Sequence, residues 1–478
     1  MKFLFTIRTK LISSLYTQLD IINRKRMEDD RSMGSTTINQ TNKIKLDDVP
    51  LNKFHIKIAG LTFGAHFTDG YILGIVGFAL TLLTPQMGLS TFWVGLIGSS
   101  ALFGLFLGSL VLGWVSDRVG RQKIFVLSFI LITVASVLQF FAETPAELVF
   151  YRILIGIGLG GDYSVGHALL AEVSPRKHRG PLLGSFSMIW TFGYVAANII
   201  GIYATSLSPD AWKWMLASSA IPAVIILFAR IGSPESPRWL ASKGRHEEAL
   251  QVIQKHFGPN VILEDPIEQE QTQESKGFMA LFHKDMIKRT LFNCIFWVCL
   301  VMPYFAIYTF LPIILDEFGL QQGFGVDLLL NGLLIIGAVL GIWFTIKFTR
   351  RGFLISSFVV LIISLGLLSI LPSNSTVLMI IAFSVFTLIL SAVSNLVGVF
   401  PAESFPTDIR SSGIGLATSI SRLGSAASTF ILPMSMANLG VQNTMLCLTG
   451  ILIVGLIVSV AWAPETKTLS LTEAGDTH

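Results

Sequence analysis

Apolar runs of about 20 residues follow one another along most of this chain, separated by short polar stretches. A helix of that length is what is needed to cross the hydrocarbon core of a bilayer. Six such runs precede a long polar interval, and six more follow it. The predicted spans are 57–83, 92–115, 124–141, 146–171, 182–204, 213–231, 290–315, 325–348, 353–371, 375–400, 411–435 and 441–463.

The polar segments divide the chain into five parts. We expect an N-terminal arm without packed structure, a first six-helix bundle, a cytoplasmic middle loop, a second six-helix bundle and a short tail. Within the loop, the sequence from Glu247 to His256 predicts an amphipathic helix. The expected boundaries are 1–55, 56–231, 232–289, 290–463 and 464–478.

Composition supports this interpretation. Of 478 residues, 52% are hydrophobic and 13% are charged, whereas soluble domains carry about 25% charged residues. We therefore expect an integral, multi-pass membrane protein. The net charge of +4 does not indicate nucleic-acid binding, because the basic residues gather in short loops between spans. These are the loops after spans 2, 4, 8 and 10, which predicts that both termini and the middle loop are cytoplasmic.

The stretch from residue 150 to 180 carries charge inside a predicted span. Arg152, Asp162 and His167 lie within it, between several glycines. A charged side chain at mid-membrane costs roughly 3 kcal/mol on insertion scales. Such residues are tolerated where they face a partner or a water-filled cavity, so this stretch predicts a helix that lines a solute pathway.

The loop between spans 2 and 3, GWVSDRVGRQK, resembles the corresponding loop of the major facilitator superfamily. Its acidic–basic–glycine–basic pattern is formed by Asp117, Arg118, Gly120 and Arg121. An internal repeat accompanies it: Glu172-Val-Ser-Pro after span 4 is echoed by Glu403-Ser-Phe-Pro after span 10. The resemblance runs from about residue 55 to 470 and is to the branch of sugar porters, phosphate–proton symporters and bacterial metabolite or organic-anion–proton symporters.

That resemblance implies an all-α membrane protein of twelve transmembrane helices in two six-helix bundles, acting as a monomer by alternating access. It also implies cytoplasmic salt bridges that close the inner gate when the cavity opens outward. The residues that it assigns to this gate are Asp117, Arg118, Arg121, Glu172, Arg179, Glu403 and Arg410.

Three charged residues are predicted to couple transport to protons. His66 and Asp69 lie three residues apart in span 1 and so share one helix face. The resemblance places spans 1 and 4 together at the cavity, which makes Arg152 the expected partner of Asp69. Asp162 corresponds to an aspartate of the phosphate–proton symporters. We therefore expect proton coupling by Asp69, Arg152 and Asp162.

Arg422 lies deep in span 11 and resembles the arginine of organic-anion carriers at that place. Two membrane arginines with two aspartates suit a carboxylate or phosphate group, and aromatic walls suit an organic body. The predicted substrate-binding residues are His66, Arg152, Asp162, Trp190, Tyr194, Asn198, Trp297, Tyr304, Tyr308, Asn395 and Arg422.

The sequence thus predicts proton-coupled symport of a small organic anion, a carboxylate-type metabolite, across the bacterial inner membrane. The alternatives are phosphate or organophosphate symport, proton-antiport efflux and sugar transport. The last is disfavoured because the glutamines of sugar porters in spans 5 and 7 are missing. No nucleophile–base pair or metal-ligand spacing is found, so we expect neither an enzyme nor a metal or cofactor. The expected partners are the substrate, protons and the lipid bilayer.

Overall fold

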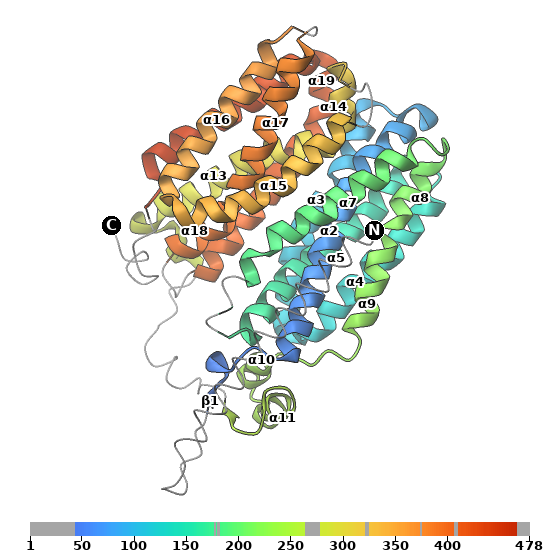
Figure 1. The fold of residues 1–478 in the computed structure, drawn as a ribbon. Helices are drawn as coiled ribbons and strands as arrows, with labels where there is room; N and C mark the ends of the chain where they lie inside the picture. Colours follow the sequence, from blue (N-terminus) through green and yellow to red (C-terminus); the bar gives the residue numbers. More distant parts are fainter. Residues whose placement is uncertain are drawn as a thin grey trace, which may run out of the picture. The chain divides into compact units, whose positions relative to one another are not determined.

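Long helices make up most of the described structure (Figure 1). The computed structural model describes residues 44–175, 178, 182–262, 278–320, 325–372, 375–405 and 410–465. Within these ranges, 11 helices are long and apolar enough to cross a membrane. The last of them lies in α19 (Arg410–Trp462), which is two helices joined at Gly440, where φ is 79°. Counting those two separately gives the twelve predicted spans.

The helices form two bundles that follow the two halves of the sequence (Figure 1). The first bundle contains α2 (Lys53–Met87), α3 (Thr91–Val119), α4 (Arg121–Leu138), α5 (Pro145–Val173), α7 (Phe186–Ala204) and the consecutive helices α8 (Ala211–Ser218) and α9 (Ala220–Arg230). The second contains α13 (Lys284–Thr309) with α14 (Leu311–Glu317), α15 (Gly325–Lys347), α16 (Arg350–Ile370), α17 (Thr376–Val393) with α18 (Leu396–Ser404), and α19. Short 3-10 turns lie at Leu46–Asp48, Gln139–Phe141 and Phe278–Phe282.

One end of the bundles, here called the basic end, carries Arg118, Arg121, Arg350 and Arg351. A glutamate caps a helix there in each half of the chain. Glu235 accepts hydrogen bonds from the backbone N–H of Arg121 at 3.0 Å and of the next residue at 3.2 Å. Glu465 accepts from the N–H groups of Arg350 and Arg351 at 3.0 and 3.1 Å. A carboxylate is favourable at a helix N-terminus because the first N–H groups have no partner within the helix.

The middle loop forms the amphipathic helix expected there, α11 (His246–Phe257), preceded by α10 (Pro237–Ser242). Residues 44–52, inside the expected arm, are packed against this loop. Strand β1 (Ile44–Lys45) pairs in parallel with β2 (Val261–Ile262). Leu46 is buried in one apolar cluster with Ile253 of α11. Val49 is buried in the same cluster, and the rest of the arm before residue 44 lies outside the described residues.

Small residues bring α3 and α5 into close backbone contact. Gly104 and Gly108 of α3 and Gly156 and Gly160 of α5 each lie four residues apart, so each pair shares one helix face. A Cβ atom at Gly156 would lie 2.2 Å from the carbonyl oxygen of Ala101. One at Gly160 would lie 2.3 Å from the carbonyl oxygen of Leu105. This contact holds α5, the helix with the embedded charges, against its neighbour.

We predict that replacing Gly160 with alanine destabilises the protein by roughly 1–3 kcal/mol, since the obstructing atoms are backbone and cannot move away cheaply. Thermal unfolding in one detergent measures this. The matched control is Gly332→Ala in α15, where nothing lies within 4 Å of the added Cβ; it should leave the unfolding temperature unchanged or slightly raised. Equal effects of the two substitutions would contradict the packing argument.

Candidate functional site

Asp69 is a carboxylate held at the centre of the first bundle. It lies in the middle of α2 and is 1% exposed. Its Oδ2 atom accepts two hydrogen bonds of 2.7 Å, one from the hydroxyl of Tyr163 on α5 and one from the indole N–H of Trp190 on α7. Its Oδ1 atom is buried and has no hydrogen-bond partner among the described residues. One half of the carboxylate is therefore fixed, and the other is available to a proton or a ligand.

Arg422 of α19, in the second bundle, is a cation that acts electrostatically on Asp69. Its guanidinium carbon lies 5.2 Å from the ring centroid of Tyr163 and 5.5 Å from that of Phe305, within the range of cation–π attraction. Its Nε atom is buried, and the described part of the chain offers it no hydrogen-bond acceptor. The first bundle thus holds a carboxylate and the second a guanidinium that acts on it, and each carries a buried polar atom without a hydrogen-bond partner among the described residues.

The structure does not bring Arg152 to Asp69. Arg152 is 1% exposed, and its Nε donates to the carbonyl oxygen of Ile97 on α3 at 2.9 Å. No ion pair joins it to a carboxylate in the described ranges, and its Nη2 is buried without a partner. The physical reason is axial position: the α5 residue that contacts Asp69 is Tyr163, and eleven residues of helix separate the two α5 positions by about 16 Å.

Asp162 is paired instead with Arg230, at the end of α9. The distance from Asp162 Oδ1 to Arg230 Nη1 is 2.6 Å, and the arginine side chain is fully buried. The guanidinium also stacks on Phe125 and Phe129 of α4, at 3.4 and 4.0 Å from the ring centroids, and donates to the carbonyl oxygen of Phe125. Asp162 thus joins α5 to α9 and α4 in a site that Arg230 neutralises.

His66 and His167 lie on the basic-end side of Asp69. Their ring centroids are 4.9 Å apart, and both rings contact Phe186 of α7 and Tyr163. The Nδ1 atom of each is bonded to a backbone carbonyl one turn earlier in its own helix. The prediction that His66 belongs to the site region is consistent with this position.

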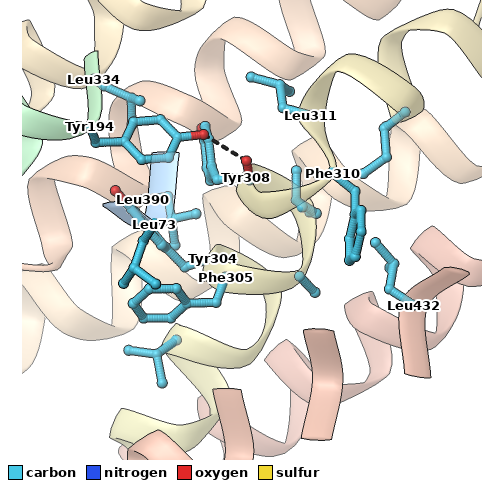
Figure 2. Close-up of a cluster of buried hydrophobic side chains, with 14 of the residues drawn as sticks. Leu73, Tyr194, Tyr304, Phe305, Tyr308, Phe310, Leu311, Leu334, Leu390 and Leu432 are labelled. Carbon is cyan, nitrogen blue, oxygen red and sulfur yellow. Dashed lines mark hydrogen bonds between the residues drawn. The ribbon is translucent and has the colours of Figure 1, made fainter. Parts of the chain in front are cut away.

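Four of the predicted aromatic residues form one cluster between the bundles, namely Trp190, Tyr194, Tyr304 and Tyr308. Trp190 stacks on Tyr194 at 5.6 Å between ring centroids, and Tyr304 and Phe305 of α13 lie 5.9 Å from Trp190. Figure 2 shows the hydrogen bond that closes this cluster, from the Tyr194 hydroxyl to the backbone carbonyl of Tyr308 at 2.6 Å. The cluster gives the Asp69–Arg422 region an aromatic wall built from both halves of the chain.

Three further predicted substrate-binding residues lie outside this aromatic cluster. Asn198 of α7 donates to the side-chain oxygen of Asn331 on α15 at 2.7 Å, a second polar link between bundles. Asn395 donates to the carbonyl oxygen of Ala338 within the second bundle, so its amide packs α15 against the α17–α18 pair. Trp297 is buried in α13, and no ring contact or hydrogen bond between it and the aromatic cluster is found in the described structure.

The predicted gate residues that can be described form pairs within each bundle. Arg121 binds Glu172 at 2.7 Å, and Glu172 also accepts from Ser236. In the second half, Arg350 lies 3.6 Å from Glu403. Arg118 stacks on Trp114. The side chains of Asp117 and Arg410, and Arg179 as a whole, lie outside the described residues.

A cavity of about 640 Å³ opens at the end opposite the basic end, lined by residues of both bundles. Its polar lining contains Asp316, Glu317, Asp327 and several threonines, and no lysine, arginine or histidine is among the described residues that form it. Asp327 is 9% exposed, and its Oδ1 atom has no partner in that part of the chain. The local potential is therefore negative.

Sequence reasoning missed four residues of this region. Tyr163 directly follows the predicted site residue Asp162, and Asn331 is a polar residue in an apolar span. Either feature could have identified these two residues from the sequence. Arg230 lies inside the predicted span 213–231 but is not among the predicted site residues, although its place near the end of that span lets its side chain reach Asp162. Phe305 is one of 35 phenylalanines, and nothing in its sequence context distinguishes it.

We predict that Arg230→Met lowers stability by roughly 3–5 kcal/mol, because it leaves the Asp162 charge buried without a partner. The double variant with Asp162→Asn should recover most of the loss. A double-mutant cycle of thermal unfolding measures the coupling. Arg118→Met, at an exposed site, is the control and should change little. Additive effects of the two site substitutions would show that the pair is not coupled.

Comparison with known proteins agrees with the fold and the motifs. A family model described as "Sugar (and other) transporter" matches residues 1–477. The inner membrane metabolite transport protein YgcS of Escherichia coli K12 is 55% identical over 436 residues, covering 91% of this chain and 97% of that protein. The putative metabolite transport protein YaaU of the same strain is 38% identical over 433 residues, covering 90% and 96%.

Among solved structures, the inward-open conformation of the xylose transporter XylE from Escherichia coli superposes with a TM-score of 0.71 at 21% identity. The match covers 88% of this chain and 99% of that one. Together with the twelve spans, these matches establish the family. The chain belongs to the sugar transporter family of the major facilitator superfamily, and it is a multi-pass membrane carrier of a small metabolite or sugar, not an enzyme.

Proposed function

We propose that this carrier couples the movement of a small organic anion to that of a proton, as a symporter of the bacterial inner membrane with its basic end in the cytoplasm. The observation that carries the proposal is that Arg422 of the second bundle acts electrostatically on Asp69 of the first. Asp69 Oδ1 and Arg422 Nε are both buried, and neither has a hydrogen-bond partner among the described residues. A carboxylate ligand supplies the acceptor that Arg422 lacks, and a proton satisfies Asp69.

Charge balance then couples the two ligands. While Asp69 is ionised, it compensates Arg422, and a substrate carboxylate would add an unpaired negative charge in a region of low dielectric constant. When Asp69 is protonated, Arg422 becomes free to bind the substrate carboxylate. Proton and anion therefore bind together and leave together.

The ion pairs at the basic end would serve as the latch of the cycle. Arg121–Glu172 and Arg350–Glu403 occupy equivalent places in the two halves, next to the helix caps formed by the loop and tail glutamates. We place the inner gate there, with Asp117, Arg179 and Arg410 as further members implied by the family resemblance. Their rearrangement would accompany each change of access.

The acidic cavity favours a second candidate, transport of a neutral, hydroxyl-rich solute such as a sugar. Its carboxylates and threonine hydroxyls can accept and donate hydrogen bonds to such a solute, while they repel an anion that enters from that side. The family description and the xylose transporter's fold also agree with it. In this case Arg422 and Asp69 would neutralise each other permanently.

Ligand binding separates the two candidates. We predict that a carboxylate from a panel of aliphatic and aromatic acids, phosphate and hexoses raises the unfolding temperature, more at acidic than at neutral pH. Arg422→Gln should abolish the shift, whereas Arg245→Gln, at an exposed surface pair, should retain it. Asp69→Asn should bind the acid at both pH values. A hexose response that is indifferent to Arg422→Gln would establish the second candidate instead.

Transport tests the coupling itself. With the acid identified, we predict that Asp69→Asn in proteoliposomes loses accumulation driven by a pH gradient but retains counterflow exchange, because the neutral amide mimics the protonated carboxyl. Asp316→Asn, in the cavity lining, is the control and should still accumulate substrate. Full accumulation by Asp69→Asn would contradict the assignment of the proton to this residue.

A further inference from the structure

Two histidines lie between Asp69 and the basic end of the first bundle, and the mechanism above does not use them. Helix α2 runs away from the basic end, and α5 runs towards it. His66 precedes Asp69 by about one turn, and His167 follows Tyr163 by about one turn. Both histidines are therefore one turn closer to the basic end than the carboxylate and the hydroxyl that bind each other. His66 is 2% exposed, whereas His167 is only partly buried.

The backbone contacts define which nitrogen of each ring is free. His66 Nδ1 lies 2.9 Å from the carbonyl oxygen of Thr62, and His167 Nδ1 lies 2.7 Å from that of Tyr163. A carbonyl oxygen only accepts, so Nδ1 carries the hydrogen in both rings and Nε2 keeps the lone pair. The Nε2 atom of His66 is buried and has no hydrogen-bond partner among the described residues. It is a buried proton acceptor without a partner, about one helical turn from the acid Asp69.

From this geometry we propose that His66 and His167 form a proton relay that connects Asp69 with the basic end. The inference rests on the proposed role of Asp69 as proton carrier. The proton leaves the Asp69 carboxyl and reaches Nε2 of His66 through a bridging water, so that His66 becomes an imidazolium. The imidazolium then gives up the Nε2 proton through water to Nε2 of His167, whose ring lies 4.9 Å away between centroids, and His167 releases it to the solvent at the basic end. Each ring returns to its neutral form, so no charge is left behind.

The surroundings make the imidazolium short-lived. The charged and titratable groups that act on or contact the two rings are Asp162 and Tyr163 on α5, Arg230 on α9 and Arg422 on α19, and Asp69 lies one helical turn from His66 on α2. Helix α7 contributes the ring of Phe186, which stacks on His66 at 4.1 Å between ring centroids. The two arginines repel a proton lodged on His66, while Tyr163 contacts both histidines and binds Asp69. A proton entering this cluster is therefore passed on, in either direction.

The test uses the proton itself as probe and needs no substrate. The full-length protein in lipid nanodiscs is mixed rapidly from alkaline to acidic pH, and tryptophan fluorescence is followed by stopped flow. Trp190 reports on Asp69 because its N–H binds that carboxylate. The part of the fluorescence change that is absent from both the Asp69→Asn and the Trp190→Phe variants is here called the Asp69 signal. The test variants His66→Phe and His167→Phe keep an aromatic ring and remove the ring nitrogens. Thermal unfolding checks that both variants fold. His66→Gln is a second variant at the same position.

We expect His66→Phe and His167→Phe each to slow the Asp69 signal by about tenfold or more while its amplitude is retained, since a positioned proton acceptor contributes at least that much to a transfer rate. His246→Phe, on the exposed face of α11, should show the wild-type rate. An Asp69 signal with wild-type rates in both relay variants would overturn the relay alone. If the wild-type protein shows no signal that depends on Asp69, both the relay and the proposed proton carrier are overturned.

Discussion

The electrostatic attraction between Asp69 in the first bundle and Arg422 in the second is the constraint on which the rest of the site depends. Each charge is expensive to bury alone, and each compensates the other in the state described here. Because the two residues belong to different bundles, any change in the protonation of one alters the force between the halves of the molecule. The surrounding rings of Tyr163, Trp190 and Phe305 exclude water and strengthen that force.

The other buried charges are arranged so that they do not compete with this pair. Asp162 is neutralised by Arg230 within the first bundle. At the basic end, each half of the chain carries its own arginine–glutamate pair and its own glutamate cap. The ion pairs described for these residues therefore lie within single bundles, and the Asp69–Arg422 region is the proposed place where a proton or a ligand acts. The acidic cavity at the opposite end adds a field that discriminates among solutes by charge.

The candidate site was predictable in part. Asp69 and Arg422 were singled out because charged residues in apolar spans are rare and need a reason, and Trp190 because aromatic walls suit an organic substrate. Their partners were not predicted, as Arg152 shows: its residue type and span were suitable, but its height on α5 places it beside Ile97 of α3. Asn395 likewise contacts α15 within its own bundle. Helix rotation and axial offset decide such contacts, and neither is encoded in residue type.

The number of spans, the repeat of charged motifs and the amphipathic helix of the middle loop could be predicted from the sequence. These depend on local quantities: the length of an apolar run, the period of its polar face and the capping residues at its ends. The pairing of Asp162 with Arg230 and the action of Arg422 on Asp69 could not be predicted in this way. These partners are 68 and 353 positions apart in the sequence, and their approach depends on how all the helices pack together.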